Sequence, residues 1–133
     1  MKSLIPRRVL AGRAISALPV MFLSFDAVIK LLAIQPVIDS FVQLGYDPGI
    51  AFAIGFLELA CLAVYLIPRT SVAGAVLLTG FLGGAIATHL RLGHPLFTHT
   101  LFPTYVAAFL WGGLLLRHDR LRALLFARTA PVH

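Results

Sequence analysis

Charged side chains are scarce in this sequence. Only 12% of its 133 residues are Asp, Glu, Lys or Arg, whereas 59% are hydrophobic. A soluble domain ordinarily carries about twice that share of charge, and a chain this short cannot enclose so much apolar surface in one globule. The deficit of charge therefore argues against a water-soluble domain and predicts that the lipid bilayer is the chain's main partner.

Cysteine and several enzyme signatures are missing or nearly so. The single cysteine, Cys61, excludes an internal disulfide and a dithiol mechanism within the chain. The sequence has no Walker loop, Rossmann glycine pattern, nucleophile elbow or haem-attachment motif. A net charge of +6 is compatible with nucleic-acid binding. The basic residues, however, gather at the two ends of the chain, so we expect no nucleic-acid partner.

What the sequence has instead is four apolar stretches, at about 14–34, 50–67, 71–90 and 99–116. A helix needs about 20 residues to cross the ~30 Å hydrocarbon layer. The apolar run of the fourth stretch begins only at residue 101 and is short, so Thr98 and His99 are expected to extend it at its start. Asp47-Pro48, Pro68-Arg69-Thr70-Ser71 and Gly93-His94-Pro95 punctuate the chain between the stretches. We predict one all-α domain over residues 1–133, a polytopic four-transmembrane-helix bundle with short loops and a basic C-terminal tail.

The distribution of Lys and Arg predicts the orientation. Basic residues flank the first and last stretches, at Lys2, Arg7, Arg8, Arg13, Arg117, Arg120, Arg122 and Arg128. Arg69 lies between the second and third stretches, whereas the loop before the second has no basic residue and the loop before the fourth has only Arg91. Positive segments stay in the cytoplasm. We therefore expect a multi-pass protein of the bacterial inner (cytoplasmic) membrane with both termini cytoplasmic, and no cleaved signal peptide.

Three further segments carry structural expectations. Residues 35–49 are too polar to span, so we expect an outer interfacial segment in which Val37, Ile38, Phe41 and Val42 face lipid. The tail "RLRALLFAR" is expected to form a helix on the inner surface. Gly74, Gly80, Gly83 and Gly84 suggest that the third helix is central, with a GxxxG pair that packs within the chain or in a homo-oligomer.

Five ionisable residues fall at or near membrane depth in the outer half: Asp26, Lys30, Glu58, His89 and Arg91. Each charge costs roughly 3 kcal/mol or more there, so such residues are functional candidates. Asp26 and Lys30 are four apart on one helix and can neutralise each other. Glu58 has no basic neighbour on its own helix, so it must be protonated or meet Lys30, His89 or Arg91 across the bundle.

These residues define a predicted outer-half pocket. We take Asp26, Lys30, Glu58 and His89 as catalytic candidates, and Thr88, Arg91 and Tyr65 as substrate-binding candidates. The alternative is a structural salt-bridge network that locks the helices together. Tyr65 also fits an anchor at the membrane interface and Cys61 a small packing residue. His89, His94 and His99 are five apart, which matches no helical face, so we expect no metal site.

The sequence resembles the DoxX-like family of small four-helix bacterial membrane proteins. The resemblance runs from about residue 25 to 125 and rests on "FDAVIKLL", "GYDP", "GFLELA", "LIPRT" and "LLTGFLGGAIATHLRLGHP". It implies the four-span fold and matching positions at Asp26, Lys30, Glu58, Arg69, Thr88, His89 and Arg91. Founding relatives are associated with thiosulfate:quinone oxidoreduction and others with membrane redox complexes, so the resemblance implies a redox link rather than a particular reaction.

Three functions remain open at this point. The first is a membrane redox enzyme or subunit that acts with a diffusible quinone and a redox partner protein. The second is a non-catalytic module for binding, transport or assembly around a small lipophilic molecule. The third is a cofactor-free acid/base enzyme, such as an isomerase, on a lipophilic substrate.

The orientation gives a first prediction. Single cysteines at residues 40 and 95 should react with an impermeant thiol reagent on intact cells, because both positions lie in outer loops of the predicted topology. Cysteines at residues 3 and 128 should react only after permeabilisation. The opposite pattern of labelling would reverse the orientation.

Overall fold

The computed structural model describes residues 4–126, and all regular structure in that part of the chain is helical. Lys2 and Arg128, which contribute to the predicted orientation, lie outside the described residues. The elements in chain order are α1 (Arg7–Leu31), α2 (Gln35–Gln43), α3 (Ile50–Leu66), α4 (Ser71–Arg91), the π-helical turn η1 (Leu96–Thr100), α5 (Phe102–Arg117) and α6 (Asp119–Phe126). The predicted all-α class is confirmed.

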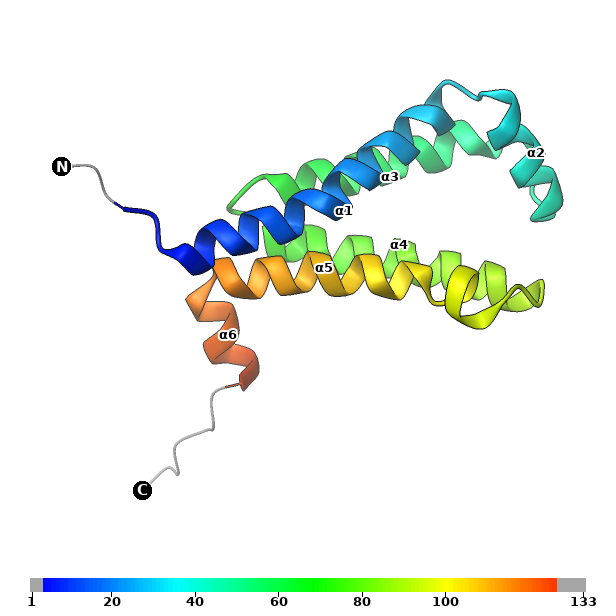
Figure 1. Ribbon diagram of the computed structural model, residues 1–133. Coiled ribbons are helices and arrows are strands. Elements are labelled where there is room, and N and C mark those ends of the chain that lie inside the picture. Colours follow the sequence, from blue (N-terminus) through cyan, green and yellow to red (C-terminus); the bar gives the residue numbers. More distant parts are fainter. Residues whose placement is uncertain (1–3, 127–133) are drawn as a thin grey trace.

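Four long helices form a bundle whose members contact one another in a ring. α1 packs against α3 and α5, and α4 packs against the same two helices from the other side. Figure 1 shows that α1 and α3 lie close to α4 and α5 at the end that carries the chain termini and diverge from them toward α2. We call these the terminal end and the α2 end. The prediction that the third helix is central is wrong, because in a ring every helix has two neighbours.

The lengths of the helices suit a membrane bundle. Three segments are long and apolar enough to cross a bilayer: Arg7–Leu31, Ser71–Arg91 and Leu96–Arg117. α3 is apolar but has 17 residues, so it measures about 26 Å. The fourth predicted span begins before residue 99, at Leu96, because η1 precedes α5 and forms one apolar segment with it. α1 begins at Arg7, seven residues before the first apolar stretch, since its first two turns carry basic residues that suit a membrane interface.

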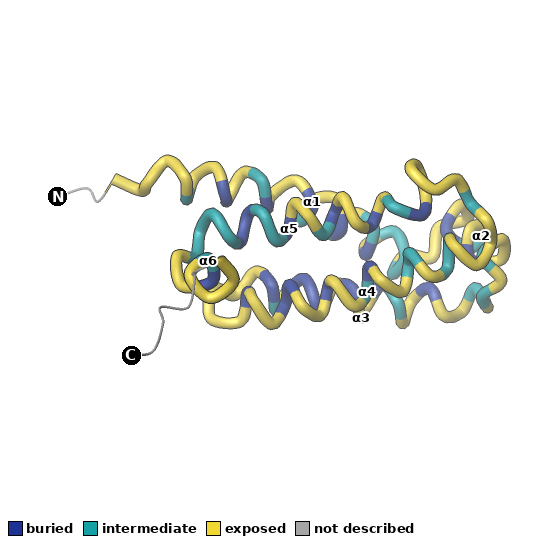
Figure 2. The backbone as a smooth tube through the Cα atoms, turned by 90° about the horizontal axis from the view of Figure 1, so that it is seen from below, coloured by how far each residue is buried: buried dark blue, intermediate teal, exposed yellow. Residues whose placement is uncertain are grey.

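The bundle turns large apolar side chains both inward and outward. Leu62, Leu78, Leu110 and Leu114 are fully buried between the helices. On the outside, Phe25, Phe56 and Val76 are more than half exposed, and Figure 2 shows exposed residues along the outer faces of all the helices. A helix that is apolar on every side belongs in lipid. The composition of the chain is therefore explained by an outer surface made for hydrocarbon.

Glycines let the helices approach closely at the terminal end. A Cβ at Gly113 on α5 would lie 2.0 Å from Ser16 Oγ and 2.7 Å from the carbonyl oxygen of Gly12 on α1. A Cβ at Gly74 would lie 2.2 Å from the backbone nitrogen of Tyr65, so α4 touches the backbone of α3 there. Because attraction between helices in lipid depends on close packing, these contacts hold the terminal end together.

The predicted GxxxG pair of the third helix makes no such contact with any of residues 4–126. Gly80, Gly83 and Gly84 have no atom within 4 Å of an added Cβ. Gly80 and Gly84 lie instead where the two helix pairs have diverged, and they line a cavity there. Of the four glycines of α4, one packs against α3 and the other three have open space beside them.

α2 differs from its prediction in the direction of its apolar side chains. Val42 is exposed, but Val37 and Phe41 are buried against Ala51 at the start of α3. The four apolar residues therefore do not all face lipid. The physical reason is that the loops on either side fold α2 back over the diverging helices, which gives half of its apolar face a protein partner.

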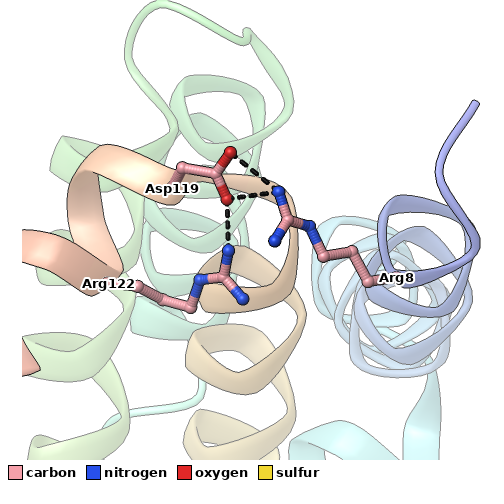
Figure 3. Close-up of polar contacts among 3 residues, drawn as sticks. All are labelled: Arg8, Asp119 and Arg122. Carbon is pink, nitrogen blue, oxygen red and sulfur yellow. Dashed lines mark hydrogen bonds and ion pairs between the residues drawn. The ribbon is translucent and has the colours of Figure 1, made fainter.

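α6 leaves the bundle at an angle to α5 (Figure 1). Its first residue, Asp119, forms an ion pair with Arg122 on the same helix and a second one with Arg8 on α1 (Figure 3). Arg8 Nη2 lies 2.6 Å from Asp119 Oδ1. Leu121 is buried, whereas Leu124 and Phe126 are exposed. An amphipathic helix of this kind suits a membrane surface.

The glycine contacts give a second prediction. Gly74→Ala should lower the melting temperature of the detergent-solubilised protein, because the new methyl group collides with the backbone of α3 and overpacking costs about 1–3 kcal/mol. Gly83→Ala makes the same change on the same helix in open space, so it is the matched control. It should leave the melting temperature unchanged or raise it slightly, since alanine is the better helix former. Equal effects of the two variants would contradict the observed packing.

Candidate functional site

A cavity of about 680 Å³ lies at the α2 end, between the diverging helix pairs. All four long helices and α2 contribute to its walls, and most of the lining is apolar. Its polar members include five of the predicted site residues: Asp26, Lys30, Glu58, Thr88 and His89. A volume of this size is typical of sites for small molecules.

Lys30 is the centre of the polar wall. Its Nζ donates hydrogen bonds to Asp26 Oδ2 at 2.5 Å and to Glu58 Oε2 at 2.9 Å, and it lies 5.4 Å from the centre of the Phe81 ring. Asp26 follows from the helical spacing, whereas Glu58 comes from α3. The bond across the helices is possible because Gly55 lets α3 approach: a Cβ there would lie 2.8 Å from Lys30 Cβ. One ammonium thus joins two carboxylates.

Glu58 carries an unusual feature. Its side chain is fully buried, with 0% exposure, and its second oxygen, Oε1, has no hydrogen-bond partner among the described residues. A buried polar atom without a partner costs about 1–3 kcal/mol. The Oε1 atom is therefore an unsatisfied acceptor on a residue of the cavity wall.

Thr88 and Arg91 hold the loop that follows α2. Thr88 Oγ1 donates to the carbonyl oxygen of Gly84 at 2.9 Å, which leaves it to accept a hydrogen bond from Tyr46 Oη at 2.7 Å. Arg91 donates to the carbonyl oxygen of Leu44 at 2.9 Å and does not line the cavity. Both residues thus fix the loop against α4, and only Thr88 is in a position to touch a molecule inside.

His89 lines the cavity, and its side-chain hydrogen bond is to His94 rather than to the Lys30 cluster. Its Nδ1 lies 2.7 Å from Nδ1 of His94, and the rings of His89, His94 and His99 have centres 5.0 to 6.1 Å apart. The spacing of the three histidines along the sequence did not predict that they lie together. They do so because Gly93, with a φ of +70°, turns the chain back toward α4. Over residues 4–126, no group of three His, Cys, Asp or Glu side chains is arranged to hold a metal ion.

Tyr65 lies far from this cavity, toward the terminal end. It is 1% exposed, so the prediction that it anchors the protein at the membrane interface is wrong. Its Oη donates to the carbonyl oxygen of Leu110 at 2.8 Å and accepts from Ser16 Oγ at 2.9 Å. Tyr65 is buried because Gly74 gives α4 room to cover it.

Sequence reasoning also overlooked residues that shape the cavity. Phe22 and Phe102, whose rings meet edge to face at 5.3 Å, line it from α1 and α5. Tyr46 lines it from the loop, within the "GYDP" motif. The motif was the signal for Tyr46, whereas the phenylalanines resemble any other lipid-facing residue.

Comparisons with known proteins agree with this architecture. A family model described as "DoxX-like family" matches residues 14–113. The match includes every side chain named so far on the cavity wall. No curated protein and no solved structure matches the chain.

The polar wall gives a third prediction. Lys30→Met should destabilise the protein more than Asp26→Asn, because it strands the fully buried carboxylate of Glu58, and removal of one partner of a buried pair costs about 3–5 kcal/mol. Combining Lys30→Met with Glu58→Gln should recover part of the loss, since the stranded charge is gone. Melting temperatures in mild detergent measure the cycle. Strictly additive losses would contradict the coupling of Lys30 to Glu58.

Proposed function

Because the chain belongs to the DoxX-like family of small membrane proteins, we propose that its cavity binds a lipophilic molecule of the quinone or quinol class and exchanges protons with it. The observation that carries the proposal is the buried Glu58 Oε1: Glu58 belongs to the wall of a largely apolar cavity, and no described residue gives this oxygen a hydrogen bond. A quinol hydroxyl is a donor of the kind this oxygen requires. The apolar walls suit the ring and tail of such a molecule.

The residues around Glu58 suit proton exchange. When a quinol is oxidised, two protons and two electrons leave it. Glu58 accepts a hydrogen bond from the hydroxyl and then its proton, while Lys30 and Asp26 stabilise the charge that shifts within the cluster. His89 lines the same cavity from α4 and provides a second proton acceptor. The electrons pass to a redox partner protein, which the proposal requires.

The location of the protein is part of the proposal. We place it in the bacterial inner membrane with both termini in the cytoplasm, because most basic residues of the described part lie at the terminal end and only Lys30 and Arg91 lie toward the α2 end. The cavity then opens in the outer half of the bilayer. Quinones dissolve in the bilayer core, so such a site is accessible to them.

A non-catalytic role has one observation in its favour. Lys30 joins α1 to α3 through Glu58, so the cluster also fastens two helices together. On this alternative the cavity is a binding, transport or assembly site for another lipophilic molecule. A cofactor-free acid/base reaction would use the same Glu58 carboxylate on a different substrate.

The fourth prediction separates these possibilities. Glu58→Gln and His89→Gln should each weaken binding of a short-chain benzoquinol about tenfold or more, a change of about 1.4 kcal/mol. Melting temperatures should hardly change, because the shapes are kept and Asp26 still neutralises Lys30. Binding is measured by equilibrium dialysis of the purified protein in mild detergent. His99→Gln, an exposed histidine that does not line the cavity, is the matched control.

Mass spectrometry of molecules that co-purify with the protein identifies the natural ligand. A quinone supports the redox-linked proposal, and an unrelated lipid supports the non-catalytic module. If Glu58→Gln and His89→Gln aggregate or melt far below the parent, the cluster is a structural network, and the proposed site should be abandoned.

A further inference from the structure

A second, smaller cavity of about 250 Å³ lies at the terminal end, far from the Lys30 cluster. α1, α3 and α5 each contribute to its lining, which consists of Arg13, Ser16, Ala17, Val20, Tyr65, Leu66 and Arg117. Two of these seven residues are arginines. The proposed quinone site does not use this cavity.

Arg117 is held in place by neutral groups alone. Its Nε donates to the carbonyl oxygen of Gly113 at 3.2 Å, and its Nη2 donates to Ser16 Oγ and Tyr65 Oη, each at 3.2 Å. The guanidinium also lies 5.8 Å from the centre of the Tyr65 ring. Since Ser16 and Tyr65 are both buried, these contacts fix the orientation of the group but do not neutralise its charge.

No side-chain carboxylate within the described part of the chain is paired with either arginine. The whole sequence contains five acidic residues, of which Asp26, Asp39, Asp47 and Glu58 belong to the α2 end or the cavity there. The fifth, Asp119, is engaged by Arg8 and Arg122 (Figure 3). Within residues 4–126, Arg13 and Arg117 form no salt bridge. Among the described residues, the cavity thus presents two positive charges with no carboxylate paired to them, which suits an anion from outside the chain.

We infer that this cavity binds the phosphate of an anionic phospholipid headgroup, held by Arg13 and Arg117. Arginine presents its N–H donors in a planar fork that fits phosphate oxygens. Basic pockets between transmembrane helices at a membrane surface are sites of this kind. Ala17 and Leu66 are exposed beside the arginines, so an acyl chain can continue along apolar surface. The ligand is a lipid rather than free phosphate, because the site combines charge with that apolar surface.

The test is a binding measurement on the full chain in mild detergent. Native mass spectrometry counts bound lipid during titration with short-chain phosphatidylglycerol, with phosphatidylcholine of the same chain length as the zwitterionic comparison. We expect phosphatidylglycerol to bind at least tenfold more tightly. Arg13→Gln changes an exposed position, so it should abolish the roughly tenfold preference for phosphatidylglycerol without changing the melting temperature. Arg117→Lys keeps the charge but loses the fork, so it should weaken binding as well.

Arg69→Gln is the matched control, since Arg69 lies in the turn between α3 and α4 and does not line this cavity. It should leave phosphatidylglycerol binding unchanged. An equal loss in Arg69→Gln would show attraction by the overall charge and overturn the inference. Equal binding of the two lipids would also overturn the inference. Competition by millimolar inorganic phosphate would overturn it as well, because it would identify a site for the free anion. The benzoquinol-binding assay should be unaffected by Arg13→Gln, so this inference and the proposed function can fail separately.

Discussion

The Lys30 ammonium donates hydrogen bonds to both carboxylates that the chain carries at membrane depth and offsets one of their two negative charges. Without it, Asp26 and Glu58 would place two charges in a medium that solvates neither. Its position also constrains the packing, because α1 and α3 must come close enough at Gly55 for a side chain on one helix to reach the other. At this point the helix register, the charge balance of the interior and the shape of the cavity depend on one nitrogen atom.

The two ends of the bundle follow different physical rules. At the terminal end, glycines at facing positions bring backbones into contact, and the buried hydroxyls of Ser16 and Tyr65 are hydrogen-bonded to each other and to Arg117. At the α2 end the glycines of α4 face open space, and one carboxylate oxygen has no partner. The tight packing at the terminal end stabilises the bundle and offsets the cost of the unpaired polar atom and the open space at the α2 end.

Much of the fold could be predicted from the sequence, because a helix in lipid must satisfy its own backbone. Apolar stretches and Pro/Gly punctuation therefore gave four helices near their true positions. The inward turn of Val37 and Phe41 could not be predicted, since an amphipathic helix suits either lipid or protein until its neighbour is known. The same holds for Tyr65, whose burial depends on a glycine nine residues later and on the helix that carries it.

The site was predictable where it depends on one helix. Asp26 and Lys30 are four residues apart, so their contact follows from helical geometry. The bond from Lys30 to Glu58 needed the ring order of the helices, and the contact between His89 and His94 needed the turn at Gly93. Neither is contained in spacing along the chain. Residues that meet across elements are therefore the part of a site that a sequence alone does not reveal.

The rim of the large cavity has a consequence for affinity. Phe22 and Phe102 line the cavity and are still 43% and 42% exposed, so its wall continues onto the surface that faces hydrocarbon. A molecule that enters by this route comes from solution in the bilayer rather than from water. Each buried methylene favours that partitioning by about 0.8 kcal/mol, so a long-tailed molecule is already highly concentrated at the entrance. A weak intrinsic affinity is then enough to fill the cavity with such a molecule. The choice among long-tailed molecules is left to the few polar atoms around Glu58.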